Sequence, residues 1–163
     1  MFDSPGGSLL ESLKMGAYIA DIPATVSAQV GASDIPNAIC ASACVYAYIA
    51  ADYRYISNGA RIGIHRFGFT ETNLDGNEGA AIGQALSGIF SEYIRSHRVE
   101  PALFEAVSSI DHSDILWVSD SDLEKWRLCH LCSAKGATGA GCGVMLAVRG
   151  CRNAISIHAI TSS

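Results

Sequence analysis

The stretch Ile39-Cys40-Ala41-Ser42-Ala43-Cys44 sets one serine among small side chains, and His65 follows 23 residues later, at the end of Ile62-Gly63-Ile64-His65. A serine that attacks a carbonyl carbon needs an uncrowded approach and a nearby base, so this pairing is the strongest chemical signal in the chain. Ser42 alone also fits a helix-capping or helix-packing role, because serine is common at helix starts. The surrounding sequence has to separate these two interpretations.

The composition is that of one folded domain. Of the 163 residues, 49% are hydrophobic and 17% are charged, which suits a globular core rather than a disordered chain. The net charge of −5 includes no basic cluster, and phosphate binding needs clustered Lys and Arg, so no nucleic-acid partner is expected. No stretch approaches the roughly 18 apolar residues that cross a bilayer.

Strand and helix patterns alternate along the chain, which predicts an α/β fold with a largely parallel sheet. Helices are predicted to begin at Ser8, near Ser42, at Pro101 and at Ser119, with a long helix over residues 79–98. Strands are predicted over residues 24–30, 53–56 and 62–64, and loops over 31–37 and 66–78. Asn58-Gly59 predicts a tight turn between the last two strands, because both residue types accept positive φ.

A glycine turn, Ser4-Pro5-Gly6-Gly7-Ser8, precedes the first predicted helix. On turn chemistry alone it is an ordinary Pro-Gly-Gly turn. Only three residues come before it, whereas a domain usually begins with a strand or a flexible segment. We therefore expect a domain that is incomplete at its N-terminus, and its localisation cannot be inferred from a targeting segment.

The glycine turn, the serine among small residues and the histidine after a short strand resemble, in their order and spacing, the proteolytic subunit of Clp protease and the wider ClpP/crotonase fold. The chain is more similar still to uncharacterised bacterial ClpP-like proteins, which carry cysteines around the serine and are often predicted to be exported. The resemblance covers roughly residues 2–128. It implies a largely parallel sheet flanked by helices, and a lean toward a periplasmic or membrane-associated location.

The same resemblance implies roles for individual residues of a serine peptidase. Ser42 would be the nucleophile and His65 the base, which suits an imidazole whose ordinary pKa lies near neutral pH. The backbone N–H groups of Gly7, with Gly6 beside it, and of Ala43 would form the oxyanion hole, since glycine lets the backbone approach a substrate closely.

The third member of the triad is an aspartate in the resemblance, and two candidates lie in the expected region. Asp114 has the better spacing from His65 and from the helix start at Ser119, although it is about one position away from the family pattern. Asp111 remains possible, and either residue also fits a solvated loop carboxylate. The other histidines have weaker claims, and His112 falls in a predicted loop.

These roles predict a hydrolase that forms an acyl-enzyme with a peptide or protein substrate, needs no cofactor or metal, and can form a homo-oligomer. The chain has no Gly-x-x-x-x-Gly-Lys loop for a nucleotide, so any unfoldase would be a separate protein. Two alternatives stay open. One is a non-catalytic ClpP-like module for assembly or binding, and the other is an acyl-CoA enzyme of the crotonase branch, which has no need of the Ser42–His65 pair.

Six cysteines divide into two groups. Cys40 and Cys44 flank the serine and could form a disulfide if the turn holds their Cα atoms within about 7 Å. We favour the reading in which they are small buried apolar residues; a bridge would imply an oxidising compartment. Cys129-His130-Leu131-Cys132 superficially resembles half of a zinc site, but the later cysteines are irregularly spaced. Residues 129–163 therefore form a Cys/Gly-rich tail of unassigned structure after a domain over 1–128.

Overall fold

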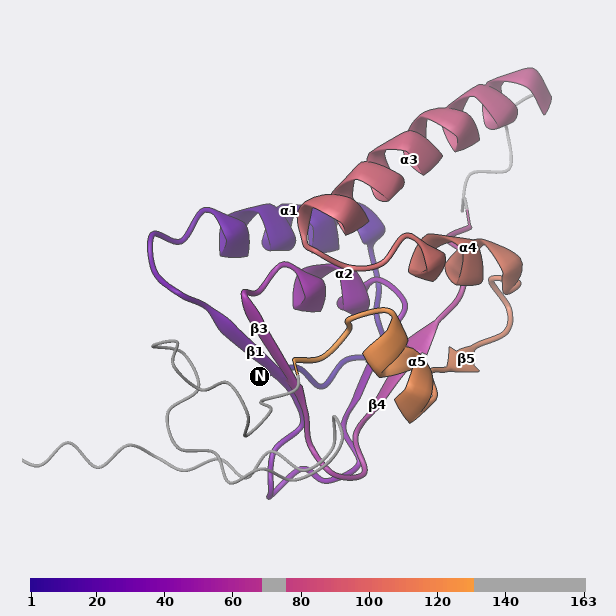
Figure 1. Cartoon of the computed structure of the whole chain (residues 1–163). Helices are drawn as coiled ribbons and strands as arrows, with labels where there is room; N and C mark the ends of the chain where they lie inside the picture. Colours follow the sequence, from indigo (N-terminus) through magenta and orange to yellow (C-terminus); the bar gives the residue numbers. More distant parts are fainter. Residues whose placement is uncertain (69–75, 131–163) are drawn as a thin grey trace, which may run out of the picture.

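The computed structural model describes residues 1–68 and 76–130, which form a mixed α/β domain (Figure 1). In chain order its elements are α1 (Leu9–Ala20), β1 (Ser27–Val30), β2 (Ile39–Ala41), α2 (Cys44–Ile49), β3 (Tyr53–Ile56), β4 (Arg61–Ile64), α3 (Gly76–Ser96), α4 (Ala102–Ser109), β5 (Leu116–Trp117) and α5 (Asp120–Lys125). All but the first two residues of the predicted tail lie outside the described residues. No helix in the described ranges combines the length and the apolar character needed to cross a membrane.

The strands form two small sheets that are mostly parallel. β1 pairs in parallel with β3, β2 pairs in parallel with β4, and β5 runs antiparallel to β4. Phe2 forms a parallel bridge to Val30 and Ser4 forms one to Cys40, so the segment before the glycine turn enters both sheets. The chain thus repeats one unit three times: an extended segment in the first sheet, an extended segment in the second sheet, and then a helix. The three units end in α1, α2 and α3.

The structure differs from the sequence-based prediction in four elements. β2 and β5 are not among the predicted strands, because three and two residues are too few to show an alternating pattern. The strand predicted over 24–30 is limited to β1, and α3 begins inside the loop predicted over 66–78. The turn at Gly59, whose φ is 83°, joins β3 to β4 as predicted, but these two strands lie in different sheets and pair with other partners.

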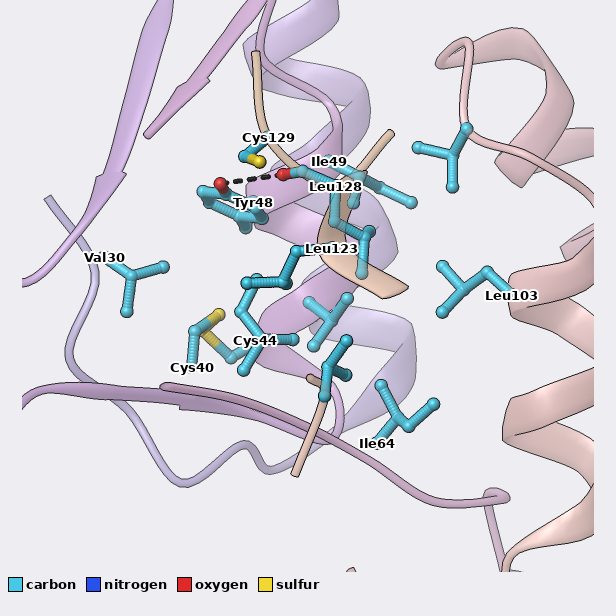
Figure 2. Close-up of a cluster of buried hydrophobic side chains, with 14 of the residues drawn as sticks. Val30, Cys40, Cys44, Tyr48, Ile49, Ile64, Leu103, Leu123, Leu128 and Cys129 are labelled. Atoms are coloured by element: carbon cyan, nitrogen blue, oxygen red, sulfur yellow. Dashed lines mark hydrogen bonds between the residues drawn. A yellow bond between two sulfur atoms is a disulfide. The ribbon is translucent and has the colours of Figure 1, made fainter. Parts of the chain in front are cut away.

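The helix after the serine is buried on every side. All six residues of α2 are buried, and the helix lies between α1 and the strands (Figure 1). Tyr48 and Ile49 have no exposed surface, and the Tyr48 hydroxyl donates a hydrogen bond to the Leu128 carbonyl at 2.9 Å (Figure 2). A helix that is apolar all round is typical of a domain centre, so the residues at its start are held firmly.

Ser12 of α1 connects that helix to the start of α2. Its hydroxyl donates to the Ala43 carbonyl and accepts a hydrogen bond from the Ala47 N–H at 3.1 Å. The residue is only 8% exposed, so both bonds lie in the protein interior, where an unpaired polar group would be costly. Ser12 therefore fixes the position of the residue that follows Ser42.

Candidate active site

Ser42 lies in the turn between β2 and α2 with a φ of 54°. A left-handed backbone is uncommon for residues other than glycine and costs on the order of 1–3 kcal/mol, so the surroundings must impose it. The Ser42 N–H donates to the Gly63 carbonyl of β4 at 2.9 Å, and the Ser42 carbonyl accepts from the Val45 N–H at 3.1 Å. The side chain is half-buried between two buried alanines, which leaves an uncrowded hydroxyl at the start of a helix.

A disulfide joins Cys40 and Cys44 (Figure 2), with a Cα–Cα distance of 5.3 Å. Because Ser42 lies between the two cysteines in sequence, the bridge closes a short covalent loop that contains it. Both cysteines are buried, as expected, but the interpretation of the pair as free thiols was wrong. The reason is the return of the chain at Ser42, which brings the end of β2 back over the first residue of α2. Cys129 is disulfide-bonded as well.

Removing the Cys40–Cys44 bridge is expected to loosen the serine turn. We expect the double variant Cys40→Ala/Cys44→Ala to lose about 2 kcal/mol of unfolding free energy, the chain-entropy value for so short a loop. Urea denaturation measures this loss. Reductant should lower the stability of the wild type in the same way, and its effect on the double variant isolates the contribution of the Cys129 bridge. Unchanged stability in the double variant would contradict the expectation.

The glycine turn packs directly against the serine turn. Gly6 has a φ of 107°, and a Cβ atom there would lie 2.7 Å from the Ala41 carbonyl oxygen, 2.7 Å from the Ser42 Cβ and 3.2 Å from the Ala43 nitrogen. Only glycine fits this contact. Gly7, with a φ of 148°, has no atom within 4 Å of the equivalent position and opens onto a cavity. Within the described residues, neither the Gly7 nor the Ala43 N–H donates a hydrogen bond to the protein.

The parallel register of β2 and β4 brings the histidine and the serine to the same end of the sheet. Ala41 is paired with Gly63, so the residues that follow the two strands, including Ser42 and His65, leave the same edge of the sheet. His65 is half-buried, and its Nδ1 lies 2.7 Å from the Arg66 carbonyl oxygen. That oxygen can only accept, so Nδ1 carries the proton and Nε2 is left as the basic nitrogen of the neutral ring.

A cavity of about 790 Å³ brings most of the predicted site residues together. Gly7, Ser42, Ala43 and His65 all line it. Its walls are apolar side chains from three helices: Leu9, Leu10 and Leu13 of α1, Tyr46 of α2, and Leu86 and Phe90 of α3. Gly6 lies one residue away and lines a smaller neighbouring cavity of about 390 Å³. The arrangement can hold a large apolar group next to a hydroxyl, an imidazole and two free N–H groups.

Within the ranges that the structure describes, neither candidate acid forms a hydrogen bond or an ion pair with the histidine. The Asp111 carboxylate pairs with Arg66 and with His112 Nδ1 at 3.0 Å. Hydrogen bonds from the backbone and hydroxyl of Ser113, and then the Arg66 charge, hold the pKa of Asp111 below its ordinary value. Asp114 is exposed. Among the described residues, neither carboxylate pairs with the His65 ring, so the assignment of the acid stays a prediction.

His112 is a cavity residue that the sequence did not single out. It lines the same cavity as Ser42, and its ring lies over Gly68, where a Cβ would be 3.3 Å from the His112 Cγ. The Arg66 N–H donates to the Ile110 carbonyl at 3.0 Å, which holds the two segments together. Contacts between segments that are far apart in sequence leave no local pattern. The one sequence signal that could have pointed to His112 is the Asp111-His112 dipeptide.

The described architecture resembles that of ClpP/crotonase-fold proteases. No family model matches the chain, and no curated protein matches it. Among solved structures it is similar to 1510-N, a membrane-bound stomatin-specific protease. A serine-to-alanine variant of 1510-N shares 18% identity with a TM-score of 0.55, over 78% of this chain and 59% of that one. A lysine-to-alanine variant of 1510-N in complex with a substrate peptide shares 19% identity with a TM-score of 0.54. That match covers 78% of this chain and 56% of the other.

At these identities the likeness establishes the fold alone. The chain spans somewhat more than half the length of 1510-N. The described lining of the large cavity includes two histidines, His65 and His112, and no lysine. Lys14 pairs with Glu11 on the exposed side of α1, at 2.8 Å.

Proposed function

We propose that the chain is a serine hydrolase of the peptidase type that forms an acyl-enzyme on Ser42. The observation that carries the proposal is the shared cavity, which is lined by the serine, the histidine and both backbone segments proposed for the oxyanion hole. The left-handed turn at Ser42 and the free Nε2 of His65 supply the uncrowded hydroxyl and the basic nitrogen that such chemistry needs.

The proposed reaction follows from these groups. His65 Nε2 takes the proton of the Ser42 hydroxyl as Oγ bonds to the substrate carbonyl carbon, and the N–H groups of Gly7 and Ala43 stabilise the oxygen anion that forms. The imidazolium then gives its proton to the leaving nitrogen, and the peptide bond breaks. Water, activated by the same histidine, releases the acyl group. Loss of one oxyanion donor typically lowers turnover about 100- to 1,000-fold.

A peptide is the proposed substrate. The large cavity has mainly apolar walls, and one 1510-N structure holds a substrate peptide. The Cys40–Cys44 disulfide supports an oxidising compartment, where such bridges persist. Assembly into a homo-oligomer stays an expectation from the resemblance.

The proposed acid is Asp114, with Asp111 as the alternative. We expect Asp114→Asn to lower kcat/KM by up to about 10⁴-fold, as for other triads that lose the orienting carboxylate. Asp111→Asn should have a much smaller effect, because that carboxylate is already bound to Arg66 and Ser113. Steady-state kinetics on the two isosteric variants separate the assignments. A wild-type rate in both would leave the Arg66 carbonyl as the group that orients His65.

A non-catalytic ClpP-like module is the second candidate, and it is favoured by the absence of a carboxylate beside His65 among the described residues. Hydrolysis of a panel of N-acetyl amino-acid p-nitrophenyl esters and short peptides tests the choice. The hydrolase proposal expects rates well above buffer that fall steeply in His65→Gln. Equal rates for wild type, His65→Gln and buffer would favour the module.

A further inference from the structure

Two buried tyrosines, Tyr46 and Tyr48, and the half-buried Tyr93 differ in how their hydroxyls are used. Tyr48 donates to the Leu128 carbonyl at 2.9 Å, and Tyr93 donates to the Tyr46 carbonyl at 2.8 Å. The hydroxyl of Tyr46 has no hydrogen-bond partner in the described part of the chain, although the residue is only 7% exposed. Buried hydroxyls are nearly always paired, so this exception needs a physical explanation.

Tyr46 lines the large cavity. Among the described buried side chains, Arg54 Nε is the one nitrogen or oxygen atom that has neither solvent-accessible surface nor a hydrogen-bond partner. Because the Tyr46 hydroxyl also has no partner but is not such an atom, its oxygen keeps part of the residue's small exposed surface. Ser42 lines the same cavity as Tyr46. Tyr46 lies on α2, one helical turn after the serine.

Its surroundings in the cavity are apolar and hold the ring in place. The Tyr46 ring packs on Phe90 of α3, with centroids 5.1 Å apart, and edge-on to Tyr93 at 6.3 Å. Leu13 of α1 and Leu86 of α3 line the same cavity. Burial raises the pKa of Tyr46 to about 12, so at neutral pH the hydroxyl is uncharged and can both donate and accept.

We infer that Tyr46 is a specificity residue, whose hydroxyl binds the polar end of a large, otherwise apolar substrate side chain, such as that of tyrosine. The inference rests on the proposed function, because the side chain in question belongs to the residue whose carbonyl Ser42 attacks. A site with an unpaired hydrogen-bonding group binds a ligand that satisfies it better than an analogue that lacks the matching group.

The test compares two esters that differ by one oxygen atom, N-acetyl-tyrosine and N-acetyl-phenylalanine p-nitrophenyl esters. The full chain is expected to prefer the tyrosine ester about 2- to 12-fold in kcat/KM, the worth of one neutral hydrogen bond. Tyr46→Phe should bring the ratio close to one by lowering the tyrosine value. Tyr18→Phe, an exposed tyrosine on α1, is the matched control and should keep the wild-type ratio. An equal ratio in wild type and Tyr46→Phe would overturn the inference.

A binding measurement separates this inference from the proposed function. Kd values for N-acetyl-tyrosinamide and N-acetyl-phenylalaninamide, measured by NMR titration of the Ser42→Ala protein with and without Tyr46→Phe, need no catalysis. Tyrosine-selective binding that Tyr46→Phe removes, together with absent hydrolysis in the wild type, would overturn the hydrolase proposal and keep Tyr46 as a ligand-binding residue. Failure of both amides to bind, or a ratio that Tyr46→Phe leaves unchanged, would overturn the inference.

Discussion

Ser42→Ala is expected to lower kcat/KM for esters and peptides by about 10⁴- to 10⁶-fold, because it removes the proposed nucleophile and the remaining groups would supply only residual catalysis. The variant should fold as the wild type does, since the Ser42 backbone bonds to Gly63 and Val45 do not involve the side chain. Initial rates and a thermal melt measure the two effects.

The matched control for this variant is Ser109→Ala, which removes an exposed hydroxyl that donates to the Ala106 carbonyl at the end of α4. It should keep the wild-type rate. If Ser42→Ala retained the wild-type rate in a folded protein, the hydrolysis would come from another group and Ser42 would return to a structural role.

Gly6→Ala is expected to lower kcat/KM by at least about 100-fold and to destabilise the domain by on the order of 1–3 kcal/mol. The added methyl group would lie 2.7 Å from the Ala41 carbonyl oxygen, which is backbone, and 2.7 Å from the Ser42 Cβ. To relieve these contacts, the glycine turn must move away from the serine turn, and the two proposed oxyanion donors would separate.

Gly83→Ala provides the comparison for Gly6→Ala. Gly83 lies within α3, and nothing is within 4 Å of its added Cβ, so the change should leave the rate unaltered and raise stability by about 0.5–1 kcal/mol. Steady-state kinetics and urea denaturation on both variants distinguish a local steric effect from a general effect of removing glycine. A wild-type rate in Gly6→Ala would contradict the proposed geometry of the oxyanion hole.

Local signals predicted several elements of the fold. The Ser8 side chain accepts from the Glu11 N–H at the start of α1, and the Ser119 side chain accepts from the Asp122 N–H at the start of α5. These N-caps depend on neighbouring residues, so a sequence pattern can reveal them. β2 and the partners of β3 and β4 depend on pairing between distant segments, and short strands carry little trace of their partners.

The candidate site also combines features that local sequence predicts with features that depend on contacts between distant segments. Gly7, Ser42, Ala43 and His65 line one cavity, and their catalytic roles stay predictions. The spacing of Cys40 and Cys44 does not by itself predict their disulfide, because spacing alone does not fix the direction of two side chains. The roles of Asp111 and His112 depend on how the loop after α4 packs against the segment after β4, which no local pattern encodes.

The central claim is that Ser42 is an activated nucleophile. Its most direct test is to treat the folded, disulfide-intact protein with a fluorophosphonate probe and to locate the adduct by peptide mass spectrometry. The account predicts a single adduct on Ser42, formed much more slowly in His65→Gln and not at all in Ser42→Ala. Intact protein that stays unlabelled, or that carries the adduct on another residue, would contradict it.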